Sequence, residues 1–221
     1  MNKDYQNSYW EQKKRRHPSD RIISDFVRPK LDFIWRYIQA PDFILDVGCG
    51  NGYFTYYLAQ IAPTIGLDNS EAMLRQNPVK TLVRGSADYL PFPDAAFDLV
   101  MCSNLLHHTS NPLHVIMEMK RTSKRYVVLS EPNRYNPAML ALSIAKREER
   151  RTLKFTFPYV RRLVHQAHLT IIDGHVMGFV TPNRMPRKVA SWFSRFNQPN
   201  PFAAYIVLIA ERPNASRSDL Q

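Results

Sequence analysis

The alternation of apolar runs and helical repeats divides the middle of the chain into strands and helices. Short apolar runs bounded by turn residues predict buried strands at residues 43–47, 64–68, 81–84, 97–103 and 126–130. Between them, apolar residues at helical spacing predict helices at residues 53–62, 71–76 and 112–121. Strands that alternate with helices in this way predict a parallel sheet with helices packed against both faces.

The segments on either side of this region follow different patterns. Before it, apolar residues recur at helical spacing from Ile22 to Ile38, and we expect Pro29 to break or bend this helix near Arg28. After it, the pattern predicts two helices and two strands, at residues 139–150, 157–168, 169–180 and 203–210. The last of these strands is apolar on both faces, so we expect it to be central in the sheet.

Composition and charge indicate the class of protein but do not identify its ligand. The chain has 221 residues, of which 44% are hydrophobic, and this is typical of a globular protein. Its formal net charge of +11 means that the surface attracts anions, whether nucleic acid, an anionic membrane surface or a phosphorylated substrate. The two cysteines form no disulfide framework, and no Cys/His spacing predicts a bound metal. The polar residues 1–20 and the lack of a long apolar run predict a cytoplasmic protein with no transmembrane segment.

A glycine-rich turn follows the first strand of this region. The sequence "ILDVGCGNG" at residues 44–52 places Gly48, Gly50 and Gly52 between that strand and the next predicted helix. A nicotinamide-dinucleotide site requires the pattern G-x-G-x-x-G, but Tyr53 stands where its last glycine should be. The phosphate-binding P-loop pattern also fails, because no Lys-Ser/Thr pair follows. A simple tight turn is the alternative for a glycine cluster taken alone.

Two carboxylates indicate which nucleotide this turn binds. Asp46 lies two residues before Gly48, where it would repel a pyrophosphate and favour a cation. S-adenosylmethionine carries an ammonium and a sulfonium and has no phosphate, so it suits Asp46 better than a dinucleotide does. Asp68 ends the next strand, 22 residues after Asp46, where a carboxylate can accept hydrogen bonds from ribose hydroxyls. That second contact is shared by dinucleotide and adenosyl ligands.

Together with three further stretches, this turn resembles a known family. The stretches are "IGLDNS" (65–70), "LPFPDAAFDLVMCSNLLHH" (90–108) and "YVVLSEP" (126–132). The chain resembles the class I S-adenosylmethionine-dependent methyltransferases of the type 11 group over residues 42–132. The resemblance implies an α/β fold with a Rossmann-like, doubly wound, seven-stranded sheet, mostly parallel with an antiparallel last strand, and S-adenosyl-L-methionine as cofactor.

The resemblance also suggests how the chain is divided. Residues 1–40 would form a basic, helical segment on the lid or substrate side of the site. Residues 41–221 would form the methyltransferase domain, in which residues 133–156 are a helical insertion on the substrate side. In folds of this kind, such segments hold the methyl acceptor.

Carried over by position, the resemblance implies a set of cofactor contacts. These are Asp46, Gly48 and Gly50 for the methionine moiety, Asp68 for the ribose, Asn69 and Ala87 for the adenine, and Asn104 with Leu105 for the floor of the pocket. The sequence departs from the family at Ser86, because such families commonly have aspartate between the glycine and alanine that match Gly85 and Ala87. We expect Ser86 or Asp88 to accept the hydrogen bond from the adenine amino group instead.

Methyl transfer from a sulfonium is an in-line displacement that depends mainly on positioning. A base is needed only if the acceptor must lose a proton. His107 and His108 follow the fourth strand, where the resemblance places residues beside the methyl group, and His108 is the preferred base. The alternative is that the pair caps the following turn.

The acceptor is less well defined by the sequence. Tyr9 is a candidate lid residue, and Glu131 and Asn133 lie just past the fifth strand as candidate substrate contacts. The insertion has an apolar surface followed by basic residues that include Arg147, which suits an acceptor with an apolar body and an anionic group. We expect a small molecule, such as a lipid-linked, isoprenoid or glycan acceptor, with peripheral membrane contact as a further option. RNA methylation and non-catalytic S-adenosylmethionine binding remain the alternatives.

Overall fold

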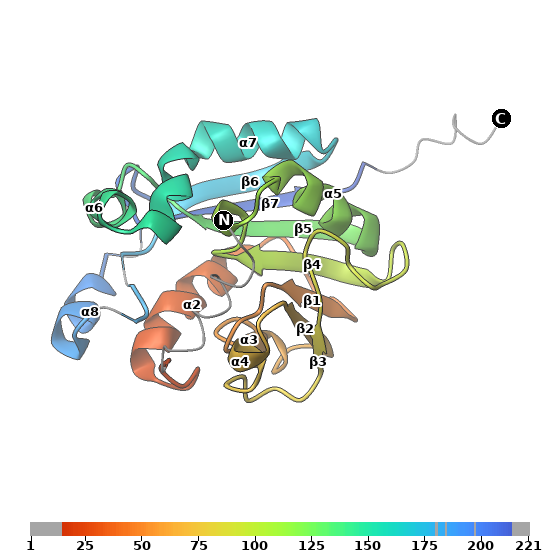
Figure 1. The fold of residues 1–221 in the computed structure, drawn as a ribbon, viewed down its shortest axis with the longest axis horizontal. Coiled ribbons are helices and arrows are strands. Elements are labelled where there is room, and N and C mark those ends of the chain that lie inside the picture. Colours follow the sequence, from red (N-terminus) through yellow and green to blue (C-terminus); the bar gives the residue numbers. More distant parts are fainter. Residues whose placement is uncertain (1–14, 180, 184, 197, 214–221) are drawn as a thin grey trace.

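A single seven-stranded sheet organises the protein (Figure 1). The computed structural model describes residues 15–179, 181–183, 185–196 and 198–213. The strand order is β3-β2-β1-β4-β5-β7-β6, and β7 runs antiparallel to both of its neighbours. The strands are β1 (Ile44–Val47), β2 (Thr64–Asp68), β3 (Leu82–Arg84), β4 (Phe97–Ser103), β5 (Ser123–Pro132), β6 (Thr170–Met177) and β7 (Tyr205–Glu211). The predicted fold class is therefore confirmed, including the central place of β7.

Helices cover both faces of this sheet. They are α2 (Arg21–Ile34), α3 (Thr55–Leu58), α4 (Glu71–Leu74), α5 (Pro112–Thr122), α6 (Pro137–Ala145), α7 (Phe157–Gln166) and α8 (Arg187–Phe193), with the 3₁₀ helices η1 (Leu106–His108) and η2 (Arg147–Lys154). The first helix after the glycine turn is shorter than predicted. The helix predicted at 139–150 ends earlier, at Ala145, and the chain continues as η2. The short α8 was not predicted.

Alternate residues along each strand face opposite sides, which produces two apolar layers. On β1, Ile44 joins the layer that contains buried residues of α2, α3 and α8. Its neighbour Leu45 joins the other layer, which contains buried residues of α5 and α7. Among the described residues no helix is both long and apolar enough to cross a membrane.

Pro29 does not break the first helix, although a break was one of the two outcomes expected for it. Helix α2 continues through Pro29 to Ile34. Proline removes one helical hydrogen bond and costs about 3 kcal/mol in a helix interior. Each large apolar side chain that becomes buried contributes about 1.5–3 kcal/mol, and the buried residues of α2 include Ile23, Phe26 and Val27. Burial against the sheet therefore outweighs the lost hydrogen bond.

Helix α2 also buries a lysine. Lys30 is 1% exposed, and its Nζ donates a hydrogen bond to the Phe26 carbonyl oxygen at 2.6 Å. The same Nζ lies 3.5 Å from the ring centroid of Phe26 and 4.2 Å from that of Tyr205. Burial lowers the pKa of Lys30 well below its ordinary value, because the charged form loses its hydration.

We expect Lys30→Met to raise the free energy of unfolding at pH 7. The unfolded chain binds this proton more tightly than the folded protein, so the wild-type stability should rise between pH 7 and pH 9.5, while that of K30M stays flatter. Each tenfold loss of proton affinity corresponds to about 1.4 kcal/mol. Urea unfolding at the two pH values tests this, with the exposed Lys188→Met as the matched control. If K30M is the less stable protein at both pH values, the two aromatic rings stabilise the ammonium more than burial disfavours it.

Candidate active site

A cavity of about 420 Å³ opens at the carboxyl ends of β1, β2 and β4. This is the point where the strand order reverses, and such switch points bind ligands in open α/β sheets. All twelve residues expected to bind the cofactor or to act in catalysis line this cavity. They are Asp46, Gly48, Gly50, Asp68, Asn69, Ser86, Ala87, Asp88, Asn104, Leu105, His107 and His108. The sequence analysis therefore selected residues that lie around one cavity, although the role of each residue stays a prediction.

The glycine turn needs its glycines for both backbone angle and space. Gly48 has φ +71°, and a Cβ there would lie 2.8 Å from Leu105 Cδ1. Gly52 has φ +89°, and a Cβ there would lie 2.3 Å from Asn77 Oδ1. The turn thus brings bare backbone to the cavity wall, which allows a ligand to approach closely.

Asp46 is buried at the end of β1 and is 2% exposed. Its Oδ2 accepts a hydrogen bond from Thr55 Oγ1 at 2.7 Å. Burial raises the pKa of Asp46 to about 7, with a further contribution from the nearby Asp68, while the Thr55 hydrogen bond opposes the rise. A carboxyl group that loses this much hydration gains strongly from a cationic neighbour, so the position suits an ammonium group in the cavity.

Asp68 is held in a fixed orientation at the end of β2. Its Oδ2 accepts from the Gly50 N–H and its Oδ1 from the Ser70 N–H, each at 2.8 Å. Burial raises the pKa of Asp68, although these backbone hydrogen bonds oppose the shift. Each carboxylate oxygen has a second acceptor position, which fits the expected contact with ribose hydroxyls.

Ser86 and Asp88 lie together on the expected adenine side. The Asp88 N–H donates to Ser86 Oγ at 3.2 Å, and Ser86 Oγ lies 3.3 Å from Asp88 Oδ2. His114 Nε2 contacts the Asp88 carbonyl oxygen at 2.8 Å and fixes this loop against α5. Both candidate acceptors for the adenine amino group are therefore available in one cluster.

Glu131 connects the end of β5 to the loop that follows β4. It is fully buried, and its Oε1 accepts from the N–H groups of Leu105 and Leu106 at 2.9 Å. Its Oε2 accepts from the His107 N–H at 3.4 Å and from His107 Nδ1–H at 2.7 Å. We expected Glu131 to contact substrate, but the structure turns it inward, where it fixes η1 and the tautomer of His107.

Two other expected substrate residues, Asn133 and Arg147, also lie away from the cavity. Asn133 is fully buried, and its Nδ2 donates to the carbonyl oxygens of Pro201 and Ala203 at 2.9 Å. Arg147 is exposed on η2 and does not line the cavity. Tyr9 lies outside the described residues.

The two histidines differ in their surroundings although they are adjacent. Burial alone would lower the pKa of His107, but its hydrogen bonds to Glu131 and Glu149 outweigh this effect and raise it to about 9. Burial, together with the nearby charge of His107, lowers the pKa of His108 to about 3. At neutral pH His108 is therefore the neutral imidazole. That it acts as the base stays a prediction.

Several cavity residues were missed by the sequence analysis. Glu149 and Arg151 reach the cavity from η2, and Phe26 and Tyr205 reach it from α2 and β7. Arg151 Nη1 donates to the carbonyl oxygens of His108 and Thr109 at 3.2 and 2.7 Å. The only sequence feature that marks Glu149 is its place in a pair of adjacent glutamates within a run of basic residues. No sequence feature marks Phe26 and Tyr205, because their surroundings in the sequence are those of ordinary core residues.

Comparison with known proteins agrees with this geometry. Residues 45–129 match the family model described as methyltransferase domain. A solved structure from Thermotoga maritima, titled a possible histamine N-methyltransferase, superposes with a TM-score of 0.68 at 17% identity over 87% of this chain and 92% of that one. Residues 45–129 therefore match a methyltransferase domain, as the sequence predicted, and the solved structure shows that most of the chain has the fold of an S-adenosylmethionine-dependent methyltransferase.

Two curated relatives share only part of their length with this chain. A malonyl-[acyl-carrier protein] O-methyltransferase of Legionella pneumophila is 38% identical over 92 residues, which cover 37% of this chain and 32% of that protein. A tRNA U34 carboxymethyltransferase of Nautilia profundicola is 29% identical over 87 residues, which cover 35% of this chain and 29% of that protein. The chain thus spans about a third of the length of these relatives.

We expect Glu131→Gln to destabilise the protein by about 3–5 kcal/mol, because it removes the closer of the two carboxylates that pair with the buried His107. The new amide group would also face backbone N–H groups that need an acceptor. Urea unfolding measures the change. Glu211→Gln is the matched control, since Glu211 lies 3.9 Å from Arg125 at the surface and should cost less than about 0.5 kcal/mol. Equal midpoints for E131Q and wild type would show that Glu131 does not organise this loop.

Proposed function

We propose that this protein transfers a methyl group from S-adenosylmethionine to a small-molecule acceptor held beneath the insertion. The observation that carries the proposal is that cofactor-side residues and insertion residues line one cavity. Asp46, Asp68 and the glycine turn form one wall, while Met139 and Leu142 of α6 contribute to the other. A donor and an acceptor bound in a shared cavity can be aligned for in-line displacement.

The lining of the acceptor side indicates the chemistry of the acceptor. Phe26, Met139, Leu142 and Tyr205 offer apolar surface, and Arg151 lines the same cavity. This combination favours an acceptor with an apolar body and an anionic or strongly polar group. Lipid-linked, isoprenoid and glycan acceptors, the classes expected from the sequence, all fit this description.

RNA is the second candidate acceptor, because the net charge is strongly positive and one relative carries a tRNA name. The basic residues, however, are spread over separate elements. Arg161 and Arg162 lie on α7, whereas Arg187 and Lys188 lie on α8, and Figure 1 places these two helices at opposite sides of the molecule. A continuous track for a phosphate backbone would require these groups to align. Their separation supports the small molecule.

Calorimetric titration with S-adenosylmethionine, and separately with NADH, tests the cofactor side. We expect only S-adenosylmethionine to bind, and Asp68→Asn to weaken binding about 10- to 100-fold, because hydrogen bonds to a charged group contribute about 1.5–3 kcal/mol. Formation of S-adenosylhomocysteine in the presence of isoprenoid, glycan-phosphate or tRNA acceptors then reports turnover. Cofactor binding without turnover on any acceptor would support a non-catalytic binding protein. NADH binding would contradict the electrostatic argument for Asp46.

We also expect the affinity for S-adenosylmethionine to rise with pH between 5.5 and 7. Burial raises the pKa of Asp46 to about 7 in the free protein, and a bound ammonium lowers it, so binding releases a proton in this range. Affinity should rise by up to about tenfold per pH unit below that pKa. Asp46→Asn should bind more weakly and lose this slope. A wild-type affinity that is flat over the same range would contradict the proposed contact.

A further inference from the structure

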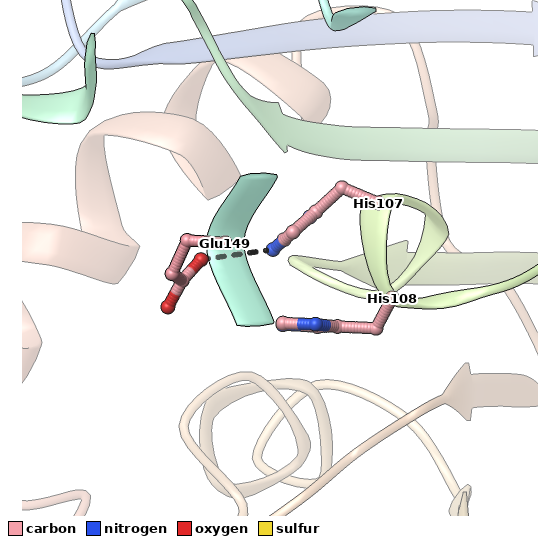
Figure 2. A group of neighbouring side chains, drawn as sticks. All are labelled: His107, His108 and Glu149. Carbon is pink, nitrogen blue, oxygen red and sulfur yellow. Dashed lines mark ion pairs between the residues drawn. The ribbon is translucent and has the colours of Figure 1, made fainter. Parts of the chain in front are cut away.

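We propose that His107, His108 and Glu149 bind a divalent transition-metal ion that holds an oxygen atom of the acceptor. This inference rests on the proposed function, because it assigns the acceptor side of the same cavity. The three side chains each offer one ligand atom, and these atoms all lie within 4.8 Å of one another. Figure 2 shows the two imidazoles extending from η1 toward Glu149 on η2.

The distance between two of the ligand atoms matches that of a shared ion. His107 Nε2 lies 3.5 Å from Glu149 Oε2. Two ligand atoms bound at about 2.1 Å to a tetrahedral ion lie about 3.4 Å apart. An ion between these two atoms therefore needs little movement of either side chain.

The surroundings of His107 are those of a metal ligand. Metal-binding histidines usually donate their second ring N–H to a carboxylate or carbonyl group, which fixes the tautomer and the ring orientation. His107 Nδ1–H donates to the buried Glu131 at 2.7 Å, which directs Nε2 toward Glu149. Glu131 is itself fixed by three backbone N–H groups of η1 and its N-cap. Glu131 thus holds His107 in a fixed orientation before any ion binds.

The donor set defines the class of ion and leaves room for a ligand. Two imidazoles and one carboxylate bind Zn²⁺ in hydrolytic sites and Fe²⁺ in non-haem sites, and in both cases coordination positions stay open. All three residues line the cavity, so an open position would face the acceptor. No sequence spacing predicted this site, because Glu149 is 41 residues from His108. The fold brings the insertion against η1.

Such an ion would prepare an oxygen acceptor for methyl transfer. A hydroxyl group bound to the ion loses its proton to solvent more readily than a free one. The oxygen lone pair then forms the O–C bond, and the C–S bond breaks with its electron pair on sulfur, which gives the methyl ether and S-adenosylhomocysteine. The predicted acceptor is therefore an alcohol, phenol or enol.

Cobalt titration of chelator-treated protein tests the site without any acceptor. We expect one Co²⁺ per chain, visible ligand-field absorption of a low-symmetry site, and displacement by Zn²⁺. His108→Ala and Glu149→Gln should each weaken binding at least about 100-fold, as expected for the loss of one ligand. Glu148→Gln is the matched control, because it removes the neighbouring carboxylate of η2, which does not line the cavity.

Binding of S-adenosylmethionine separates this proposal from the proposed function. It should be unchanged within about twofold in H108A and E149Q, which also shows that both variants fold. Absence of Co²⁺ and Zn²⁺ binding in wild type, or equal binding in both ligand variants, would overturn the metal site and leave His107 and Glu149 as an ion pair. Metal binding in a protein that fails to bind S-adenosylmethionine would instead contradict the proposed function alone.

Discussion

The buried carboxylate of Glu131 is the interaction on which the acceptor side of the site depends. It accepts hydrogen bonds from backbone N–H groups of Leu105, Leu106 and His107 and from the His107 ring. Loops that follow parallel strands usually vary in conformation, because little of their backbone is held by the sheet. Here the loop after β4 is tied to the end of β5. The position of both histidines thus follows from a side chain that does not reach the cavity.

The cofactor side depends on a different constraint, which is the burial of acidic groups near bare backbone. The glycine turn excludes side chains from the space in front of β1, and the cavity behind it is lined by the buried Asp46 and the half-buried Asp68. Burial raises the pKa of Asp46, the nearby Asp68 raises it further, and both carboxylates disfavour anions nearby. A phosphate-bearing cofactor would add to this repulsion, whereas a sulfonium and an ammonium relieve it. The proposed preference for a cofactor without phosphate therefore rests on the carboxylates at these two strand ends.

The strand pattern, the glycine turn and the strand-end carboxylates could be predicted because they follow local rules. Each strand is a short apolar run, and Asp46 and Asp68 each stand at a strand end, which places them at one edge of the sheet, whereas the other cofactor-side residues were assigned by the resemblance to a known family. The directions of Glu131 and Asn133 could not be predicted, since both stand at the same edge and only tertiary packing turns them inward. Glu149 was missed for a related reason: its contact with η1 depends on where α6 ends. At Pro29 the local rule predicts an interrupted helix, but the burial of apolar side chains of α2 keeps the helix continuous.

The antiparallel β7 has a consequence for how the chain folds as it is synthesised. Strand β7 pairs with β5 over residues 126–132 and with β6 over residues 170–177, yet it is the last of the seven strands in the sequence. Until residues 205–211 leave the ribosome, the apolar β5 and β6 each lack a neighbour, and unpaired apolar edges invite association with other chains. The site, which uses Tyr205, is also incomplete until then. The protein therefore gains its central strand and completes its cavity in one step.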